Sequence, residues 1–279
     1  MNRCIELFAT LALASLLGTA TAQAPATSAP AKPTTPHNIG SAKLIIGAVK
    51  QNQAFYEKMF GMQEVAHYQS ETYDEPIMGF DGGARIALFS PKAAPALKKS
   101  QFPVALIYTP EFDAVVKRIE AAKHPILRLP AAQSGAFKIA IARDPSGNAI
   151  EIFSREGKGY EVGGSKLIVD DRQKAEDFFV RILGAKPGER YQTAAYDEVI
   201  MNVGEGAFLA LFQPKNEEPL PKSPSPVVAI YTSEFDAVLK RVTEAGLGYR
   251  EVKSTQLKAR IIVAKDPAGN GIEIISRAE

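Results

Sequence analysis

The chain repeats itself: the segment between residues 43 and 155 returns between residues 166 and 277, about 123 positions later. The stretch IYTPEFDAVVKR, which begins at Ile107, returns as IYTSEFDAVLKR from Ile230, with ten of twelve letters identical. A period near 120 residues is far longer than the roughly 20 to 50 of solenoid or propeller units. The sequence therefore predicts two copies of a whole domain, and chemical groups that occur in both copies are the first candidates for function.

Two further matches extend the duplication towards both ends of each copy. HYQSETYDEPIM from His67 returns as RYQTAAYDEVIM from Arg190, and DPSGNAIEI from Asp144 returns as DPAGNGIEI from Asp266. The offset changes from 123 to 122 between these matches, so only one net residue separates the copies in length. The two copies should therefore fold alike.

Composition excludes one class of partner. The 279 residues are 46% hydrophobic and 23% charged, which suits an ordinary globular chain of about two domains. Thirty-three basic and 31 acidic side chains leave a formal charge of +2, and the basic residues are scattered along the sequence. Nucleic-acid binding requires a concentrated basic surface, so no nucleic-acid partner is expected.

The first 22 residues have the features of an export signal. Arg3 provides the positive charge, a short apolar run follows, and Ala20-Thr21-Ala22 is a suitable cleavage site, with Ala22-Gln23-Ala24 as a second one. The apolar run is shorter than the ~20 residues that span a bilayer, so no membrane span is expected after cleavage. Residues 23–39 are rich in Ala, Pro and Thr and indicate a flexible tether. The expected location is periplasmic or secreted, which suits a mature chain without cysteine, because Cys4 lies within the signal.

Each copy divides into two halves of the pattern strand, helix, several strands. In the first half, the segment QNQAFYEKMFGM should form a helix that ends at Gly61, after a short strand from Lys43 to Gly47. In the second half, a helix should begin with Thr109 as its N-cap and Pro110 at its first position. Each copy is thus predicted as βαβββ followed by βαβββ.

Paired βαβββ units, a helix of the FYEKMFG type and a final strand introduced by DPxGNxIEI resemble the vicinal oxygen chelate superfamily. That superfamily includes glyoxalase I, bleomycin resistance proteins and extradiol dioxygenases. The resemblance implies an α+β fold of tandem glyoxalase-like domains at residues 40–157 and 160–279. In each domain, two βαβββ modules would form a curved sheet with helices on its outer face and an open concave face.

The resemblance also implies where a divalent metal ion would be held. His, His, Glu and Glu are usual at four positions of the family site, on the first and last strands of each half. Here only the last Glu remains, and one carboxylate is too few for a catalytic metal ion. No metal or other cofactor is therefore predicted, with one divalent ion as the alternative. The equivalent positions are Ser41 and Gly164, Val104 and Val227, Ala87 and Ala210, and Glu151 and Glu273.

Strand alternation indicates which side chains share the concave face with the former ligand positions. Lys, Tyr and Glu occur there in both copies, and we expect Lys43 to pair with Glu151 and Lys166 with Glu273. These pairs could be structural, could orient a polar group of a ligand, or could support acid-base catalysis by Glu151 or Glu273 with Tyr108 or Tyr231. The predicted ligand-binding residues are Lys43, Arg85, Phe89, Tyr108, Glu151, Lys166, Phe212, Tyr231 and Glu273.

Other repeated groups are expected at the rim of the concave face, with turn formation and edge protection as their predicted role. They are Tyr68 and Tyr191, Gln69 and Gln192, Tyr73 and Tyr196, Asp74-Glu75 and Asp197-Glu198. The three histidines of the mature chain, His37, His67 and His124, have no counterpart in the second copy, and we expect surface or edge roles for them.

The function predicted from these residues is metal-free binding of a small aromatic or carboxylic molecule by an exported protein. A glyoxalase-like lyase or isomerase, or a dioxygenase, is the first alternative. A structural or protein-interaction module whose concave faces are filled by their own side chains is the second alternative. The expected assembly is a monomer with pseudo-dimeric domains or a homodimer.

Overall fold

The computed structural model describes residues 35–93, 102–130, 138–215, 222–223, 225–246 and 248–277. The predicted export signal, both of its cleavage sites and residues 23–34 of the predicted tether lie outside these residues. In the described part of the chain, no helix is long and apolar enough to cross a bilayer.

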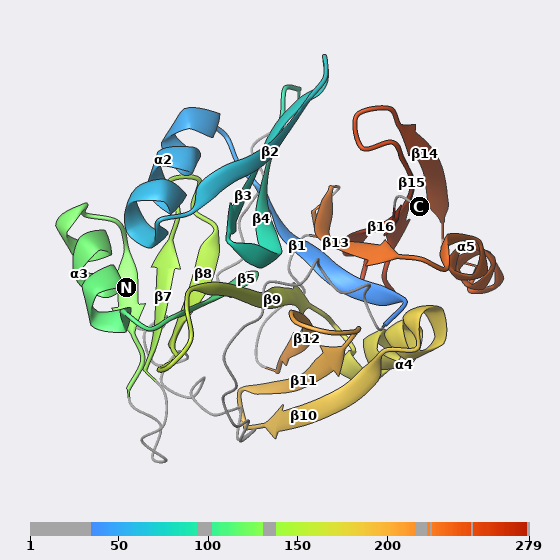
Figure 1. The fold of residues 1–279 in the computed structure, drawn as a ribbon. Coiled ribbons are helices and arrows are strands. Elements are labelled where there is room, and N and C mark those ends of the chain that lie inside the picture. Colours follow the sequence, from blue (N-terminus) through green and yellow to red (C-terminus); the bar gives the residue numbers. More distant parts are fainter. Residues whose placement is uncertain are drawn as a thin grey trace, which may run out of the picture.

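Each of the four halves of the described chain contains one helix and four strands, which confirms the predicted βαβββ pattern. Curved sheets form the centre and the helices lie on their outer side (Figure 1). The helices are α2 (Val49–Phe60), α3 (Phe112–Ala121), α4 (Arg172–Leu183) and α5 (Phe235–Glu244).

The strands divide into two curved halves of eight strands each, joined where Ala84 pairs with Val162. In spatial order the first sheet contains β2 (Gln63–Gln69), β3 (Tyr73–Phe80), β4 (Gly82–Pro91), β1 (His37–Ile45), β13 (Pro226–Thr232), β16 (Gly271–Ser276), β15 (Ala259–Lys265) and β14 (Tyr249–Ser254). The second contains β10 (Lys186–Gln192), β11 (Tyr196–Asn202), β12 (Phe208–Pro214), β9 (Glu161–Ile168), β5 (Ala105–Thr109), β8 (Ala149–Ser154), β7 (Ile139–Arg143) and β6 (Ile126–Arg128).

The two copies exchange halves between the sheets. The first half of copy one joins the second half of copy two, because β1 pairs antiparallel with β13. The second half of copy one joins the first half of copy two through the antiparallel pair of β5 and β9. The expectation that the two halves of one copy share a concave face was therefore wrong. Equivalent halves of the two copies are similar in sequence, so either pairing satisfies the same hydrophobic pattern.

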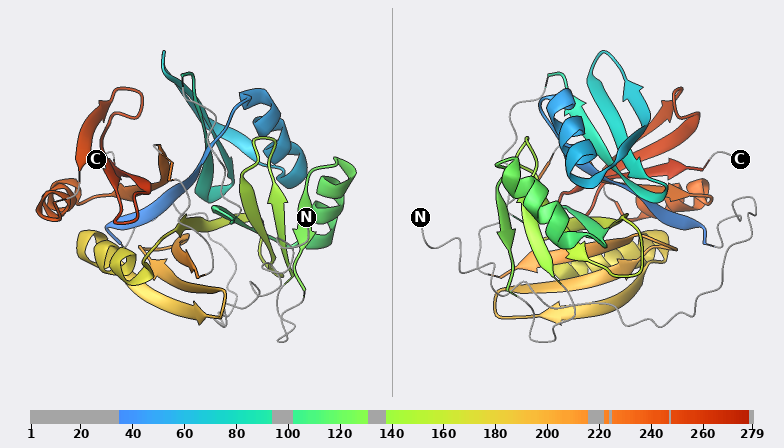
Figure 2. Two further views of the ribbon diagram at one scale, coloured as in Figure 1. Left: turned by 180° about the vertical axis from the view of Figure 1, so that it is seen from behind. Right: turned by 60° about the vertical axis from the view of Figure 1, so that its left-hand side comes forward.

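The helices, in contrast, stay with their own copy. Helix α2 lies beside α3 on one side of the molecule, and α4 lies beside α5 on the other (Figures 1 and 2). Helix α2 buries Phe55, Tyr56, Met59 and Phe60 against the sheet and ends at Gly61, whose φ of 74° is left-handed. That ending was predicted, because glycine adopts this conformation without steric cost.

The start of α3 was predicted too early. The helix begins at Phe112 with Glu111 as the N-cap, and no side chain caps it. The Thr109 hydroxyl instead accepts a hydrogen bond from the Glu111 N–H at 2.9 Å, so it shapes the turn before the helix.

The first strand was also longer than predicted. It begins at His37, which pairs with Thr232 on β13, rather than at Lys43. The His37 side chain is buried, and its Nδ1 lies 2.8 Å from Thr232 Oγ1. His37 was expected in the tether but is a buried residue of β1. Its pairing with the distant strand β13 was not visible in the sequence.

The DPxGN motif has a structural role in both copies. Asn148 Nδ2 donates to Asp144 Oδ2 at 2.7 Å and to the Ile45 carbonyl at 3.2 Å. Asn270 repeats this with Asp266 at 2.8 Å and with the Ile168 carbonyl at 3.0 Å. The motif therefore ties the turn before each last strand to the end of the first strand of the same copy.

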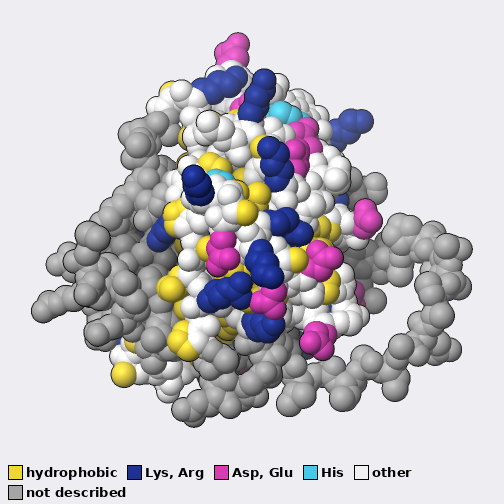
Figure 3. All heavy atoms as spheres, turned by 90° about the vertical axis from the view of Figure 1, so that its left-hand side faces the viewer, with side chains coloured by type: hydrophobic (Ala, Val, Ile, Leu, Met, Phe, Trp, Pro, Cys, Tyr) yellow, Lys and Arg dark blue, Asp and Glu magenta, His cyan; other side chains and the backbone are white. Residues whose placement is uncertain are grey.

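The outer face around α3 carries both signs of charge. Figure 3 shows Lys and Arg side chains interspersed with Asp and Glu on this side of the molecule. Arg128 and Lys138 both pair with Asp113, for example. This face does not present the continuous basic surface that nucleic acid requires.

Candidate functional site

Two lysine-centred clusters lie on the concave faces, one in each sheet. In the Lys43 cluster, Lys43 Nζ is 2.7 Å from Glu273 Oε2 and 2.8 Å from Glu75 Oε1. In the Lys166 cluster, Lys166 Nζ is 3.0 Å from Glu151 Oε2 and 3.0 Å from Glu198 Oε1. We use these two names for these two groups of three residues.

The predicted partners of the lysines were exchanged. Lys43 pairs with Glu273 instead of Glu151, and Lys166 pairs with Glu151 instead of Glu273. The cause is the exchange of halves, which places β16 in the sheet of β1, separated from it by β13, and β8 in the sheet of β9, separated from it by β5. Because the two glutamates are equivalent positions of the repeat, the sequence alone could not distinguish the two pairings.

The third member of each cluster was missed as a site residue. Glu75 and Glu198 were expected at a rim, yet both are 7% exposed. Each lies on a strand directly opposite a concave-face aromatic residue, as Glu198 pairs with Phe212. The signal that could have identified them was present, since a carboxylate recurs at this position in both copies.

The carboxylates and the ammonium of each cluster affect one another's ionisation. Burial by itself lowers the pKa of Lys43, but Glu273 and Glu75 outweigh it and raise that pKa above its ordinary value. The pKa of Lys166 is raised in the same way by Glu151 and Glu198. Burial raises the pKa of Glu75, opposed by Lys43 and reinforced by Glu273. Each lysine therefore remains charged, and burial makes Glu75 easier to protonate than a glutamate in water.

The Lys166 cluster is sealed by its own surroundings. The side chains of Lys166, Glu151 and Glu198 are only 3%, 3% and 9% exposed. The ring of Phe212 lies 5.2 Å from Lys166 Nζ, and Phe102 packs on Phe212 with ring centroids 5.0 Å apart. These aromatic rings belong to a hydrophobic cluster of the concave face that also buries Leu129, Ile139, Ile141, Ala149, Ile168 and Tyr196.

The Lys43 cluster is more open. Glu273 has a side-chain exposure of 16%, against 3% for its counterpart Glu151. Phe89 and Tyr73, with ring centroids 5.5 Å apart, are half-buried, whereas their counterparts Phe212 and Tyr196 are fully buried. Tyr231 is also half-buried and lies against Gly40, where any side chain would collide with its ring. The three aromatic rings therefore reach the solvent beside the charged group.

The difference in burial follows from a few substitutions between the copies. Positions that carry large apolar residues around the Lys166 cluster carry smaller or polar ones around the Lys43 cluster. Side chains therefore fill less of the concave face around Lys43. The pairs, with the Lys166 side first, are Phe102 and Ser225, Leu106 and Ala229, Phe153 and Ile275, and Phe208 and Arg85.

Among the described residues, the predicted site residues Tyr108 and Arg85 make no hydrogen bond or ion pair with the charged centres. Tyr108 is buried against Gly163, with its ring 4.8 Å from the Arg155 guanidinium and 5.4 Å from Phe153. Burial raises the pKa of Tyr108 to about 12, so it stays protonated at neutral pH. Arg85 is exposed on the strand position opposite Ser41, at the edge of the open concave face.

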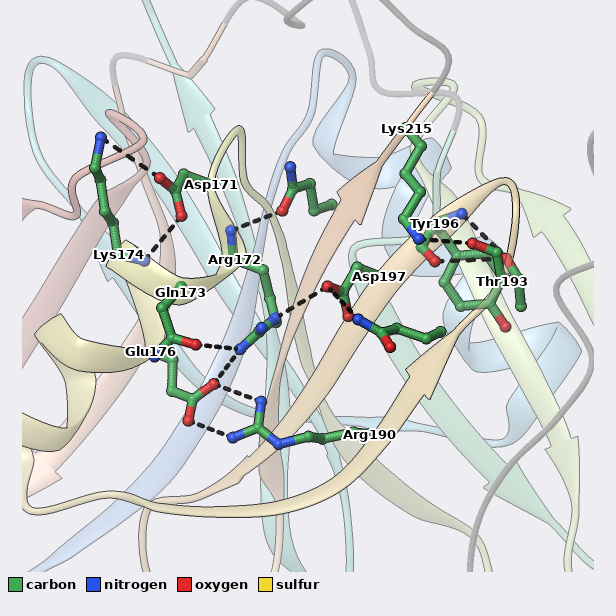
Figure 4. Close-up of polar contacts among 12 residues, drawn as sticks. Asp171, Arg172, Gln173, Lys174, Glu176, Arg190, Thr193, Tyr196, Asp197 and Lys215 are labelled. Carbon is green, nitrogen blue, oxygen red and sulfur yellow. Dashed lines mark hydrogen bonds and ion pairs between the residues drawn. The ribbon is translucent and has the colours of Figure 1, made fainter.

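The polar contacts of the strands at the rim of each concave face differ between the two clusters. Beside the Lys166 cluster, Glu176 of α4 binds Arg190 through two hydrogen bonds and also binds Arg172 (Figure 4). Arg172 Nε also lies 3.4 Å from Oδ2 of Asp197, the residue before Glu198 (Figure 4). Beside the Lys43 cluster, His67 and Gln69 of β2 both contact Asp74 of β3, with distances of 2.6 and 3.2 Å from their Nε2 atoms to Asp74 Oδ1.

The residues at the family's metal-ligand positions do not fit a divalent ion. Lys43 places its ammonium against Glu273, so a positive charge of the protein already occupies the coordinating side of the carboxylate. In the described ranges, no three His, Cys, Asp or Glu side chains are grouped so that they could hold a metal ion. We therefore assign no metal-dependent step, and the cofactor prediction stays a prediction.

Comparison with known proteins identifies the family. The model of the Glyoxalase/Bleomycin resistance protein/Dioxygenase superfamily matches residues 38–152 and again residues 162–274. The chain therefore belongs to this superfamily, with two tandem domains, and the resemblance found in the sequence is confirmed.

Two individual likenesses are more distant. Glyoxalase I from Zea mays superposes with a TM-score of 0.74 and 19% identity, over 86% of this chain and 92% of that one, which shows a shared fold. The Streptomyces peucetius "Anthracycline biosynthesis protein DnrV" is 24% identical over 179 residues. That match covers 61% of this chain and 64% of the relative.

Proposed function

We propose that this protein is an exported member of the superfamily that binds a small organic molecule, without a metal ion, at the Lys43 cluster. The Lys166 cluster, in this proposal, serves stability alone. The aromatic rings of Tyr73, Phe89 and Tyr231 would contact the body of the ligand, and the charged centre would contact a polar substituent.

One observation carries the proposal: the same three charged residues occur twice, but only one set remains partly accessible. A buried ion pair between well-packed neighbours needs no ligand, which describes the Lys166 cluster. Half-exposed aromatic rings around a buried charged centre are typical of small-molecule sites, where apolar walls surround a few placed polar groups.

The test is a compound screen by thermal denaturation, since a ligand that binds the folded state raises Tm. Anthracyclines belong in the library, because one relative is a protein of anthracycline biosynthesis. Hits are then compared on two matched variants. Ala229→Leu copies the residue of the closed cluster into the open one, and Leu106→Ala makes the reverse change.

Ala229→Leu should weaken binding at least tenfold, because the added side chain enters the concave face beside Glu273, its partner on the next strand. Leu106→Ala should leave the affinity unchanged. Ile275→Phe, which copies Phe153, provides a second blocking variant if Ala229→Leu does not fold. Binding that survives both blocking variants, or that requires Leu106, would contradict the proposal.

Export is proposed from residues 1–22 alone. Expression in a bacterial host with N-terminal sequencing of the exported protein should give a chain that begins at Gln23, or at Pro25 for the second cleavage site. A full-length chain retained in the cytoplasm would contradict export without affecting the binding site.

One observation favours a second candidate function, proton transfer on the bound molecule. Glu75 is buried beside the open concave face, and burial raises its pKa, a change in the direction that suits a general acid or base. Glu75→Gln should then abolish turnover of a substrate but retain its binding, which a pure binding protein would not show.

A further inference from the structure

The charges of the Lys43 cluster do not balance among themselves. One ammonium faces two carboxylates, all three groups are largely buried, and Glu75 Oε1 has no hydrogen bond of good geometry although it is 2.8 Å from Lys43 Nζ. A buried carboxylate without a full set of partners costs free energy, so a positive or hydrogen-donating group beside it is favourable.

The neighbouring groups do not supply that positive charge. His67 pairs with Asp74 on the rim rather than with Glu75, with an Nε2 to Oδ1 distance of 2.6 Å. Arg85 is exposed at the edge, opposite Ser41, two residues along the strand from the position opposite Lys43. Its charge lies outside the pair of carboxylates and faces the solvent end of the site.

The aromatic side chains around the cluster suit a cation as well. Lys43 Nζ already lies 5.4 Å from the centre of the Phe89 ring. Tyr73 stacks beside Phe89, and Tyr231 lies on the other side, half-buried. Rings of this kind attract a cation over their faces, in addition to the attraction of the carboxylates.

We propose that the ligand of the Lys43 cluster is an aromatic amine whose cationic nitrogen contacts the carboxylates of Glu75 and Glu273 on the side away from the Lys43 ammonium, a refinement that rests on the proposed binding function. The carboxylates of the protein repel an anionic substituent from the same place. A carboxylic ligand, which the sequence left open, would have to turn its acid outwards to Arg85.

The Lys166 cluster provides the internal control. It has the same charges, but Phe102 and its neighbours close the space in which a ligand cation would lie. Burial and Glu151 raise the pKa of Glu198.

The test uses three naphthalene probes that differ only in charge: 2-naphthylmethylamine, 2-naphthalenemethanol and 2-naphthoate. Affinities are measured by titration calorimetry on the full mature chain at neutral pH and moderate salt. We expect the amine to bind most tightly and the acid most weakly, with at least a tenfold difference between them. Glu75→Gln and Glu273→Gln should each remove most of that difference.

Glu198→Gln, the matched change in the closed cluster, should leave the order of the three affinities unchanged. Arg85→Gln should weaken the acid only. Equal affinities, or tightest binding of the acid, would overturn the amine proposal while leaving the binding site intact. If none of the three probes nor any library compound binds, the proposed function itself fails.

Discussion

The two lysine clusters have the same charges but different surroundings. Around Lys166, large apolar residues exclude the solvent, and the three charged groups are almost fully buried. Around Lys43, smaller or polar residues leave Glu273 and three aromatic rings partly exposed. The comparison indicates that the charged centre is part of the duplicated scaffold, while the covering side chains determine whether a ligand can reach it.

The largest expected difference between the clusters concerns removal of the lysine. Lys166→Met leaves two carboxylates buried without a counter-charge, and we expect a loss of about 3 to 5 kcal/mol in the free energy of unfolding. Lys43→Met should cost less, because water can reach Glu273. Urea denaturation followed by circular dichroism measures both, and a larger loss for Lys43→Met would remove the distinction.

Opening the closed cluster should have the next largest effect. Phe102→Ser copies the counterpart Ser225 and removes a buried ring that packs on Phe212, so we expect a loss of about 3 kcal/mol. The same change should give the protein a second binding site for the ligands of the Lys43 cluster. Titration calorimetry should show the stoichiometry rise from one to two, and a value that stays at one would show that more than Phe102 closes this face.

A smaller effect is expected from the rim of the closed cluster. Arg190→Gln removes two hydrogen bonds to the buried carboxylate of Glu176. We expect a loss of about 1 kcal/mol, since Arg190 itself is well exposed and its charge is partly screened. His67→Gln, the matched change in the other copy, should cost less at neutral pH. Chemical denaturation of the two variants decides the order.

The smallest effect is a pH dependence at the rim of the open cluster. A hydrogen bond to Asp74 raises the pKa of His67 above 6.5. Burial raises the pKa of Asp74, but the hydrogen bonds from His67 and Gln69 outweigh it and lower that pKa.

The contribution of His67 is therefore complete below pH 6.5 and is lost as the pH rises through the raised pKa of the folded state. Because both groups are partly exposed, we expect less than about 1 kcal/mol. After division by the intrinsic exchange rate at each pH, hydrogen exchange of the β2 and β3 amides should accelerate over this range, and that of β10 and β11, which Arg190 holds, should not. The same pH dependence of exchange in both strand pairs would contradict this assignment.

Much of the fold could be predicted from the sequence because its signals are local. Glycine at the end of α2, the apolar side of each helix and the DPxGN turns all depend on neighbouring residues. The family followed from the same motifs.

The site could be predicted only in part, because it depends on contacts between distant segments. Lys43 and Glu273 are 230 positions apart, and nothing local distinguishes Glu273 from Glu151 as the partner. The burial of Glu75 depends on the curvature of the sheet, although its recurrence as Glu198 indicated that it mattered. The differences between the side chains around the two clusters were visible as substitutions such as Phe102 and Ser225. Their effect on burial could be inferred only from the three-dimensional arrangement.

The account depends most on one cluster being accessible and the other not. Two-dimensional NMR of the protein titrated with 2-naphthylmethylamine tests this directly, because it reports on both clusters in one sample. We predict changes in the signals of β1, β4, β13 and β16 around Lys43, with those of β5, β8, β9 and β12 unchanged. Changes centred on Lys166, or spread equally over both clusters, would contradict the account.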